Sequence, residues 1–286
     1  MTVMTLEYEI AVATGAALGE GPTWDAAAGR LLWVDILGCE VHAYDPATGT
    51  DGVVLKTAQH VGAVKPRAAG GLVVNLRDGI GLYEPDGSFR WLVELPEDGR
   101  RGNDAAVGPD GALWAGTMAY DERPGGGVLR RVRPDGQVTT VLDDVTISNG
   151  IAWSPDGLLM YYIDTPTGRV DVFDFDPGTA TLHGRRPFAA VPPPGSPDGL
   201  TVDAEGHVWV AVWAGGRVLR FAPSGTVDRV VELPASQTTA CAFGGPDLRD
   251  LYVTTATVGA DDRAHAGSLF VVPNAGQGIP APAFGG

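Results

Sequence analysis

One short pattern recurs six times along this chain, and it constrains the fold more than any other feature of the sequence. In most copies a polar residue precedes an apolar run, a tight turn follows, and a second apolar run leaves the turn. The clearest copy reads ISNGIAWSPDG over residues 147–157 and continues into an apolar run over residues 158–163. Pro presets φ in such a turn, Asp bonds the nearby backbone and Gly accepts a positive φ, so each copy predicts a β-hairpin.

The spacing of these hairpins predicts how they assemble. Successive copies lie about 40–50 residues apart, which is the period of a four-stranded propeller blade. One blade cannot bury its own apolar faces, so the copies must stack and close into a ring. The sequence therefore predicts an all-β fold, a six-bladed β-propeller, formed by residues 1–286 as a single domain. Two separate β-sandwiches are the alternative, but they would not predict so regular a spacing.

Composition narrows the class of protein. The chain has 286 residues, 44% of them hydrophobic, and its 41 glycines and 22 prolines suit a turn-rich β protein. A net charge of −15 argues against nucleic acid and anionic membranes as partners. No basic segment followed by an apolar core opens the sequence, and no apolar run approaches membrane-spanning length, so we expect a cytoplasmic protein. The sequence does not indicate an oligomeric state.

Three further features bear on how the ring closes. Residues 6–13 alternate between apolar and other residues, which predicts a strand that pairs with the last blade and removes a sheet edge. Cys39 and Cys241 fall in the first and last repeats, which a closed ring would bring together. A disulfide is possible, although two buried thiols are the favoured interpretation. Residues 273–286 are rich in Pro and Gly and are expected to be irregular.

Equivalent positions of the repeats carry oxygen-bearing side chains. The residue just before each expected inner strand is, in order, Glu20, Val61, Asn103, Asn149, Asp198 and Thr239. Similar repeats would place these six residues on a circle at one mouth of the central channel. Carboxylate and carboxamide oxygens are the ligands preferred by Ca²⁺, Mg²⁺ or Mn²⁺. A simple turn role could explain any one of them, but four at the same place favour a divalent-metal site.

The loops near this mouth complete a candidate site. The segments 119–127 and 192–197 are longer or more irregular than their counterparts, and both should lie near the start of the inner strands, where they could gate a ligand. Arg101 is close enough to the mouth to bind hydroxyl or carbonyl oxygens of a substrate. The sequence contains no nucleophile elbow, zinc-binding helix motif, paired CxxC or phosphate loop, so it does not indicate those chemistries.

Six segments, which cover nearly the full chain, resemble one known family. They are LGEGPTWD (residues 18–25), RGNDAAV (101–107), AGTM (115–118), ISNGIAWSPDG (147–157), SPDGLTVDAEGHVWVA (196–211) and FGGPDLRDLYVTTA (243–256). In these segments the sequence is similar to the SMP-30/gluconolactonase/luciferin-regenerating enzyme family. The resemblance implies a six-bladed propeller with one divalent metal in the channel, held by Glu20, Asn149 and Asp198.

The resemblance also suggests how a substrate binds. It implies that Arg101 is a substrate-binding residue and that Asn103 is a substrate contact or a looser metal ligand. The family often has a Glu in the loop after AGTM. The matching position here is Asp121, with Glu122 next to it, and either could take this role.

These inferences converge on a hypothesis about activity. We expect metal-dependent hydrolysis of an aldonolactone, such as glucono-, xylono- or arabinonolactone, with Asp198 orienting or deprotonating the attacking water. The metal could be Ca, Zn, Mg, Mn or Fe. One alternative is a propeller phosphotriesterase or other esterase, and another is a non-catalytic calcium- or sugar-binding protein.

Overall fold

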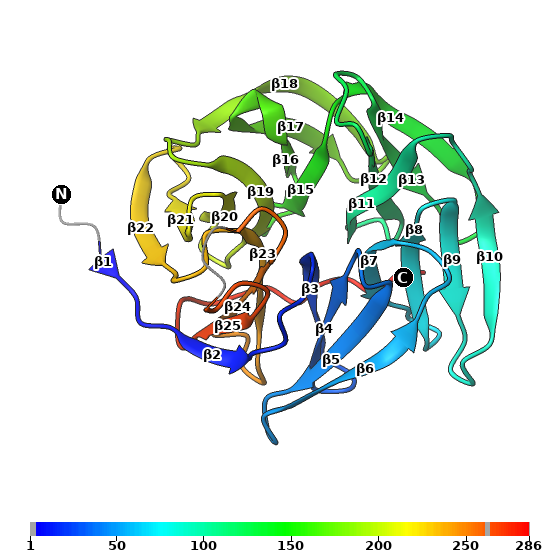
Figure 1. Ribbon diagram of the computed structural model, residues 1–286. Coiled ribbons are helices and arrows are strands. Elements are labelled where there is room, and N and C mark those ends of the chain that lie inside the picture. Colours follow the sequence, from blue (N-terminus) through cyan, green and yellow to red (C-terminus); the bar gives the residue numbers. More distant parts are fainter. Residues whose placement is uncertain (1–3, 261–263, 286) are drawn as a thin grey trace.

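Six β-sheets surround a central channel, which confirms the predicted six-bladed β-propeller (Figure 1). The computed structural model describes residues 4–260 and 264–285. Five sheets have four strands, and the sheet of the fifth blade gains an additional strand from the N-terminal segment. That residues 1–286 form a single domain stays a prediction.

The strands of each blade follow one another outward from the channel. The first three blades are β3 (Gly19–Asp25), β4 (Arg30–Asp35), β5 (Glu40–Asp45) and β6 (Thr50–Lys56); β7 (Val61–Pro66), β8 (Leu72–Leu76), β9 (Gly79–Tyr83) and β10 (Phe89–Glu94); and β11 (Arg100–Val107), β12 (Leu113–Ala119), β13 (Gly127–Val132) and β14 (Val138–Val145). The last three blades are β15 (Ser148–Trp153), β16 (Leu159–Asp164), β17 (Arg169–Asp176) and β18 (Thr181–Ala190); β19 (Ser196–Val202), β20 (Val208–Trp213), β21 (Arg217–Phe221), β22 (Val227–Glu232) and β1 (Met4–Thr5); and β23 (Thr238–Gly244), β24 (Asp250–Thr255), β25 (Leu269–Val272) and β2 (Glu9–Val12).

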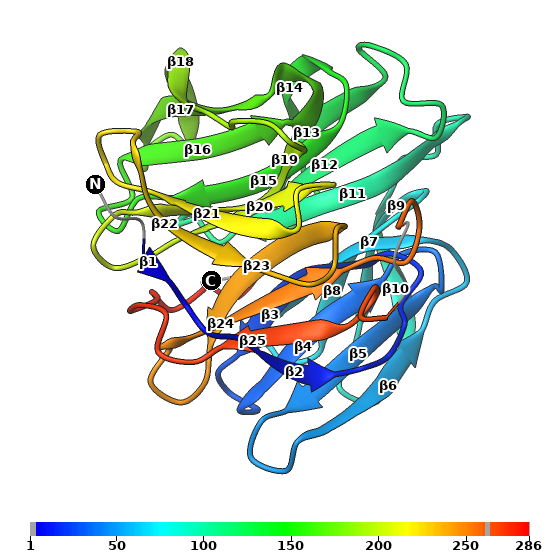
Figure 2. The same cartoon turned by 60° about the vertical axis from the view of Figure 1, so that its left-hand side comes forward.

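The N-terminal strand closes the ring, as the sequence predicts. Strand β2 lies beside β25 and pairs with it in antiparallel orientation, so that the last blade is built from both ends of the chain (Figure 2). The strand spans Glu9–Val12 rather than the expected residues 6–13, because β25 offers only four residues for pairing. Ile10 is 40% exposed on this outermost strand, whereas Val12 packs against the core.

The two cysteines remain free thiols, so the possible disulfide does not form. Cys241 is buried in the inner strand β23, in agreement with the favoured interpretation. Cys39 is only partly buried, because it occupies the β4–β5 turn with a positive φ of 56°. The ring does bring the first and last blades together, as the hydrogen bond from Thr239 Oγ1 to the carbonyl oxygen of Gly19 (2.6 Å) shows.

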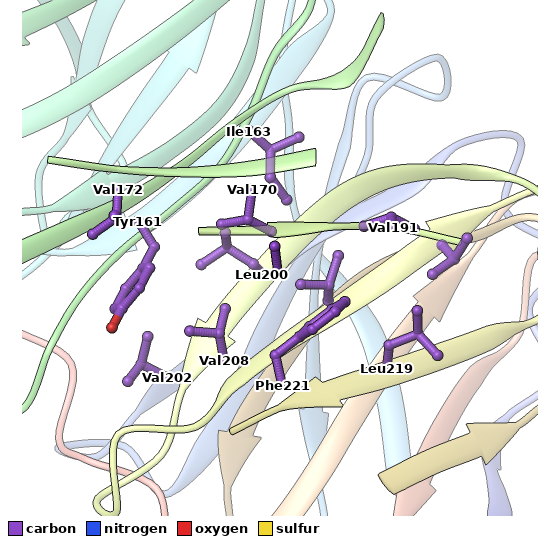
Figure 3. Close-up of a cluster of buried hydrophobic side chains, with 13 residues drawn as sticks. Tyr161, Ile163, Val170, Val172, Val191, Leu200, Val202, Val208, Leu219 and Phe221 are labelled. Atoms are coloured by element: carbon purple, nitrogen blue, oxygen red, sulfur yellow. The ribbon is translucent and has the colours of Figure 1, made fainter. Parts of the chain in front are cut away.

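Apolar side chains fill the spaces between blades. Between the fourth and fifth blades, Tyr161 and Val170 face Leu200, Val208 and Phe221 (Figure 3). Fully burying one such aliphatic or aromatic side chain contributes about 1.5–3 kcal/mol. Each blade thus depends on its neighbours for burial, which is why the ring must close.

Each inner strand has an irregularity in its pairing at an equivalent place. The register skips from Gly102 to Ala105 in β11, from Ser148 to Ile151 in β15 and from Pro197 to Leu200 in β19, with related skips in β3, β7 and β23. Such bulges redirect a side chain without ending the strand.

The bulges correct one expectation about the site. We expected Glu20, Asn103, Asn149 and Asp198 just before the inner strands, but all four lie inside them. The strand pairing continues beyond each of these residues because the bulge accommodates the residues that have no partner on the neighbouring strand.

The turns and the tail match the sequence pattern. Gly111 and Gly157 close their turns with φ of 72° and 69°, the conformation for which glycine was expected there. Residues 273–285 form no strand, and this C-terminal segment crosses from β25 past β3 towards β7 (Figure 1). The three-residue 3₁₀ turn η1 (Thr165–Thr167) is far too short to cross a membrane, and no helix within the described ranges has the length and hydropathy of a span.

Glycines beside the bulges allow the inner strands to approach one another, and this can be tested. A Cβ atom on Gly150 would lie 2.7 Å from the backbone nitrogen of Leu200 and 2.9 Å from the carbonyl oxygen of Asp198. Gly150→Ala should therefore lower the free energy of unfolding by about 1–3 kcal/mol. In urea unfolding, the control Gly52→Ala should stay within about 0.5 kcal/mol of the wild type, because nothing lies within 4 Å of its Cβ. Equal effects would contradict this packing.

Candidate metal and substrate site

A chain of side-chain amides links two neighbouring inner strands. Asn103 on β11 donates from Nδ2 to Asn149 Oδ1 on β15 (2.9 Å) and to the carbonyl oxygen of Ser148 (2.9 Å). Asn149 in turn donates from Nδ2 to Thr165 Oγ1 (2.8 Å). Arg101 donates to Asn103 Oδ1 (2.7 Å). This network fixes both carboxamides, so the sequence-predicted residues Arg101, Asn103 and Asn149 do come together.

The two carboxylates of the candidate site are buried and largely unpaired. Glu20 on β3 and Asp198 on β19 are each 6% exposed. One Glu20 oxygen accepts a hydrogen bond from the backbone nitrogen of Gly21 (2.8 Å). Over residues 4–260 and 264–285, no donor lies within hydrogen-bonding distance of the Asp198 carboxylate, and no basic side chain forms an ion pair with either acid.

Burial and neighbouring charges oppose the ionisation of both acids. Burial, with a further contribution from the charge of Asp104, raises the pKa of Glu20 from 4.5 to about 8. Burial raises the pKa of Asp198 well above its ordinary value, and the charges of Glu20 and Asp104 raise it further. Arg101 offsets only part of this. Both acids can therefore ionise together near neutral pH only if further positive charge enters the site.

These residues fit a divalent cation. Two unpaired, buried carboxylates would balance a 2+ charge, and a fixed carboxamide oxygen adds a neutral ligand. Glu20, Asn149 and Asp198 are the residues that would hold such an ion, with Asn103 beside them. Their role as ligands is a hypothesis that follows from the chemistry of the donors.

The mouth of the channel brings a cation and an aromatic pair to the same place. Burial lowers the pKa of Arg101, and four nearby acidic groups oppose that shift: Tyr120, Glu20, Asp198 and Glu122. His60 Nδ1 and the Tyr120 hydroxyl form a hydrogen bond of 2.7 Å between the second and third blades. Burial and the charges of Arg101 and Arg77 lower the pKa of His60, which keeps this imidazole neutral at physiological pH.

The loop between β12 and β13 carries both acidic residues that were considered as substrate contacts, and their surroundings differ. Asp121 forms an ion pair with Arg123 (2.9 Å), and its side chain is 66% exposed. Glu122 follows with a φ of 53°, and its charge acts on Arg101. The charge of Glu122, unlike that of Asp121, is thus among those that act on Arg101.

Sequence reasoning missed two charged residues next to the site. Asp104 and Lys65 both line the channel below Glu20, and each has its pKa shifted by burial, upward for Asp104 and downward for Lys65. A signal was available for Lys65, which is one of only two lysines in the chain. Asp104 directly follows Asn103, but its placement depends on the bulge in β11, which the sequence pattern did not show.

A second group of possible metal ligands lies elsewhere in the fifth blade. Asp203, Glu205 and His207, in the β19–β20 turn, offer ligand atoms within 4.8 Å of one another. The Asp203 carboxylate already accepts hydrogen bonds from the backbone nitrogens of Glu205 (3.0 Å) and His207 (2.9 Å) and from Trp209 Nε1 (3.0 Å). These bonds indicate that the Asp203 carboxylate stabilises the turn, whereas the Asp198 carboxylate has no such bonds within the described residues.

Comparison with known proteins assigns the chain to a family. Residues 18–257 match the family described as SMP-30/Gluconolactonase/LRE-like region. Regucalcin from Xenopus laevis is 37% identical over 298 residues, covering 99% of both chains. Pentonolactonase from Haloferax volcanii is 37% identical over 279 residues, covering 94% of this chain and 95% of its own. The structure of a calcium-binding regucalcin from Agrobacterium tumefaciens superimposes with a TM-score of 0.93, at 33% identity and with 99% of both chains covered.

The fold and its candidate site thus define a six-bladed β-propeller with buried acids in its channel. This chain belongs to the SMP-30/gluconolactonase family, which confirms the resemblance seen in the sequence. The roles of individual site residues stay a prediction.

The buried acids predict how stability depends on pH in the metal-free protein. Between about pH 5 and about pH 8 the folded chain keeps a proton on Glu20 that the unfolded chain releases, so the free energy of unfolding should fall as pH rises. Urea unfolding of chelator-treated wild type and Glu20→Gln should show a flatter dependence for the variant, which cannot lose this proton. An equal or steeper fall in the variant would contradict the assignment.

Proposed function

We propose that this chain is a metal-dependent hydrolase that opens a sugar lactone to the corresponding sugar acid. Support comes from its family and from a relative named as a pentonolactonase. The observation that carries the proposal is the pair of buried, unpaired carboxylates, Glu20 and Asp198, beside the Arg101 guanidinium. This arrangement suits a carboxylic ester hydrolase that must bind an uncharged carbonyl and stabilise negative charge on it.

Each site residue has its own role in such a reaction. A divalent ion held by Glu20, Asn149 and Asp198 would supply Lewis acidity toward the lactone carbonyl. Arg101 donates to hydroxyl or carbonyl oxygens of the sugar, and Asn103 keeps Arg101 in place through their hydrogen bond. These contacts orient the ring so that its carbonyl carbon faces Asp198.

Asp198 is the proposed general base. Its carboxylate accepts no hydrogen bond within the described ranges, so it is free to accept one from water. Water attacks the carbonyl carbon as Asp198 takes its proton. The ring C–O bond then breaks, and the proton passes from Asp198 to the departing ring oxygen, which yields the open hydroxy acid. Without an ion, burial raises the pKa of Asp198 above that of a free aspartate, whereas a bound cation favours the ionised carboxylate that the base requires.

Several finer points remain proposals. The substrate is an aldonolactone such as glucono-, xylono- or arabinonolactone, and the ion is Ca, Zn, Mg, Mn or Fe. Cytoplasmic location stays a prediction.

A metal-by-lactone activity matrix on chelator-treated protein tests the function. Each of the five ions should be paired with five- and six-carbon aldonolactones and, for comparison, with a phosphotriester. We expect no turnover without metal and lactone turnover with at least one ion. Phosphotriester turnover without lactone turnover would favour the esterase alternative. Metal-dependent stabilisation with no turnover of any substrate would favour a binding protein.

The role of Asp198 gives a direct prediction. Asp198→Asn should lower kcat by about 10²–10⁴-fold, because the amide cannot accept the proton from water. Circular dichroism should show an unchanged fold, since in the described residues Asp198 makes no side-chain hydrogen bond that the fold would lose. A variant that retains wild-type kcat at saturating metal would remove Asp198 from the mechanism.

The two acids of the mouth loop form a matched pair for a second prediction. Glu122→Gln should raise KM several-fold, because it removes a charge that acts on the substrate-binding Arg101. Asp121→Asn should leave KM near the wild-type value, because Asp121 pairs with Arg123 at the surface. Steady-state lactone hydrolysis measures both, and the opposite order would show that Asp121 contacts the substrate.

A further inference from the structure

The channel contains a chamber at the end opposite the mouth. A cavity of about 550 Å³ lies among the later residues of the inner strands and their turns, including Pro109 and Pro155. The site residues Glu20, Asn149 and Asp198 lie near the beginnings of the same strands. This volume is typical of sites for small organic molecules.

The C-terminal segment forms part of the chamber wall. The backbone nitrogen of Gly278 donates to the carbonyl oxygen of Leu248 in the sixth blade (2.7 Å), and that of Phe284 donates to Pro66 in the second blade (2.9 Å). Between these anchors, residues 279–282 line the cavity. They span the channel end as a strap, which makes this a built compartment rather than a simple gap between turns.

The chamber is apolar on its walls and polar at its inner end. Trp24, Trp153 and Phe243 present aromatic surface to it. Towards the metal site it is lined by Thr23, Lys65 and Asp104. A mainly apolar wall with a few convergent polar groups is the usual composition of a ligand site.

Lys65 has unused hydrogen-bonding capacity in this chamber. Its ammonium group donates to Thr23 Oγ1 (2.5 Å), and within the described ranges it makes no other hydrogen bond and no ion pair. An ammonium has three donors, and Lys65, which is only partly buried, pairs one of them within the described residues, so two donors still need an acceptor. An acceptor oxygen brought by a ligand would meet this need. In contrast, Lys56, the only other lysine, is 76% exposed and pairs with Glu40.

We propose that this chamber is a second binding site, for an uncharged molecule that has a flat apolar ring system and one carbonyl oxygen. The carbonyl accepts a hydrogen bond from Lys65 Nζ, and the rings pack against Trp24 and Phe243. Because the Asp104 carboxylate also lines the chamber and the chain carries a net charge of −15, an anion is disfavoured. The site is separate from the proposed lactone site.

Prodan, an uncharged naphthalene with a propionyl group and polarity-sensitive fluorescence, is a suitable probe. Titrated into the metal-loaded protein, it should show saturable binding with a blue-shifted emission. Lys65→Met should weaken binding by about tenfold or more, whereas the matched control Lys56→Met should bind as the wild type does. Absence of saturable binding, or equal affinity in Lys65→Met, would overturn the proposal.

Competition defines the chemical class and the location. 2-Acetylnaphthalene should displace prodan, whereas 2-ethylnaphthalene, which lacks the carbonyl, should be about tenfold weaker. Stronger displacement by 2-naphthoate would overturn the preference for an uncharged ligand. If Lys65→Met fails to fold, Ala242→Leu, which fills the chamber from β23, should abolish binding. Binding should persist in Glu20→Gln and in the presence of gluconolactone, so that the result does not depend on the proposed lactonase activity.

Discussion

Two like charges held together in a closed channel set the chemistry of this molecule. Glu20 and Asp198 come from the first and fifth blades, and burial at the channel axis raises the pKa of both. Neither residue can move away from the channel axis, because each lies on an inner strand that is packed between neighbouring blades. The ring therefore keeps both carboxyl groups buried, where a bound proton or a cation is needed to offset their negative charge. Packing between blades supplies the free energy that holds the acids in this arrangement.

The bulges show how a regular fold accommodates an irregular site. An undisturbed inner strand would continue its pairing through positions such as Asn149, but the ladder skips there and resumes at Ile151. The adjacent Gly150 has no Cβ to collide with the next strand. Similar skips in all six blades bring the same strand position close to the channel axis. Only the residue type then decides whether a blade contributes a buried oxygen-bearing side chain, such as Asp198, or apolar packing, such as Val61.

The features that depend on the sequence repeats could be predicted, whereas those that depend on tertiary contacts could not. Hairpin signals are local, so the six blades could be predicted from turn residues such as Pro155 and Gly157. The closing strand could be predicted from the alternation over residues 6–13, and the family from longer matching segments. The meeting of Asn103 and Asn149 followed from equivalent positions in the repeats. The position of Glu122 depends on a single loop, and the surroundings of Lys65 depend on residues from several blades and the tail. Neither leaves a pattern in the sequence.

The central claim is that the buried acids form a cation site at the channel axis. Anomalous diffraction from a crystal soaked in Mn²⁺ tests it most directly, because the peak locates the ion without reference to activity. We expect one dominant peak within bonding distance of oxygens of Glu20, Asn149 and Asp198. A dominant peak at Asp203, Glu205 and His207, or no peak on the axis, would contradict it.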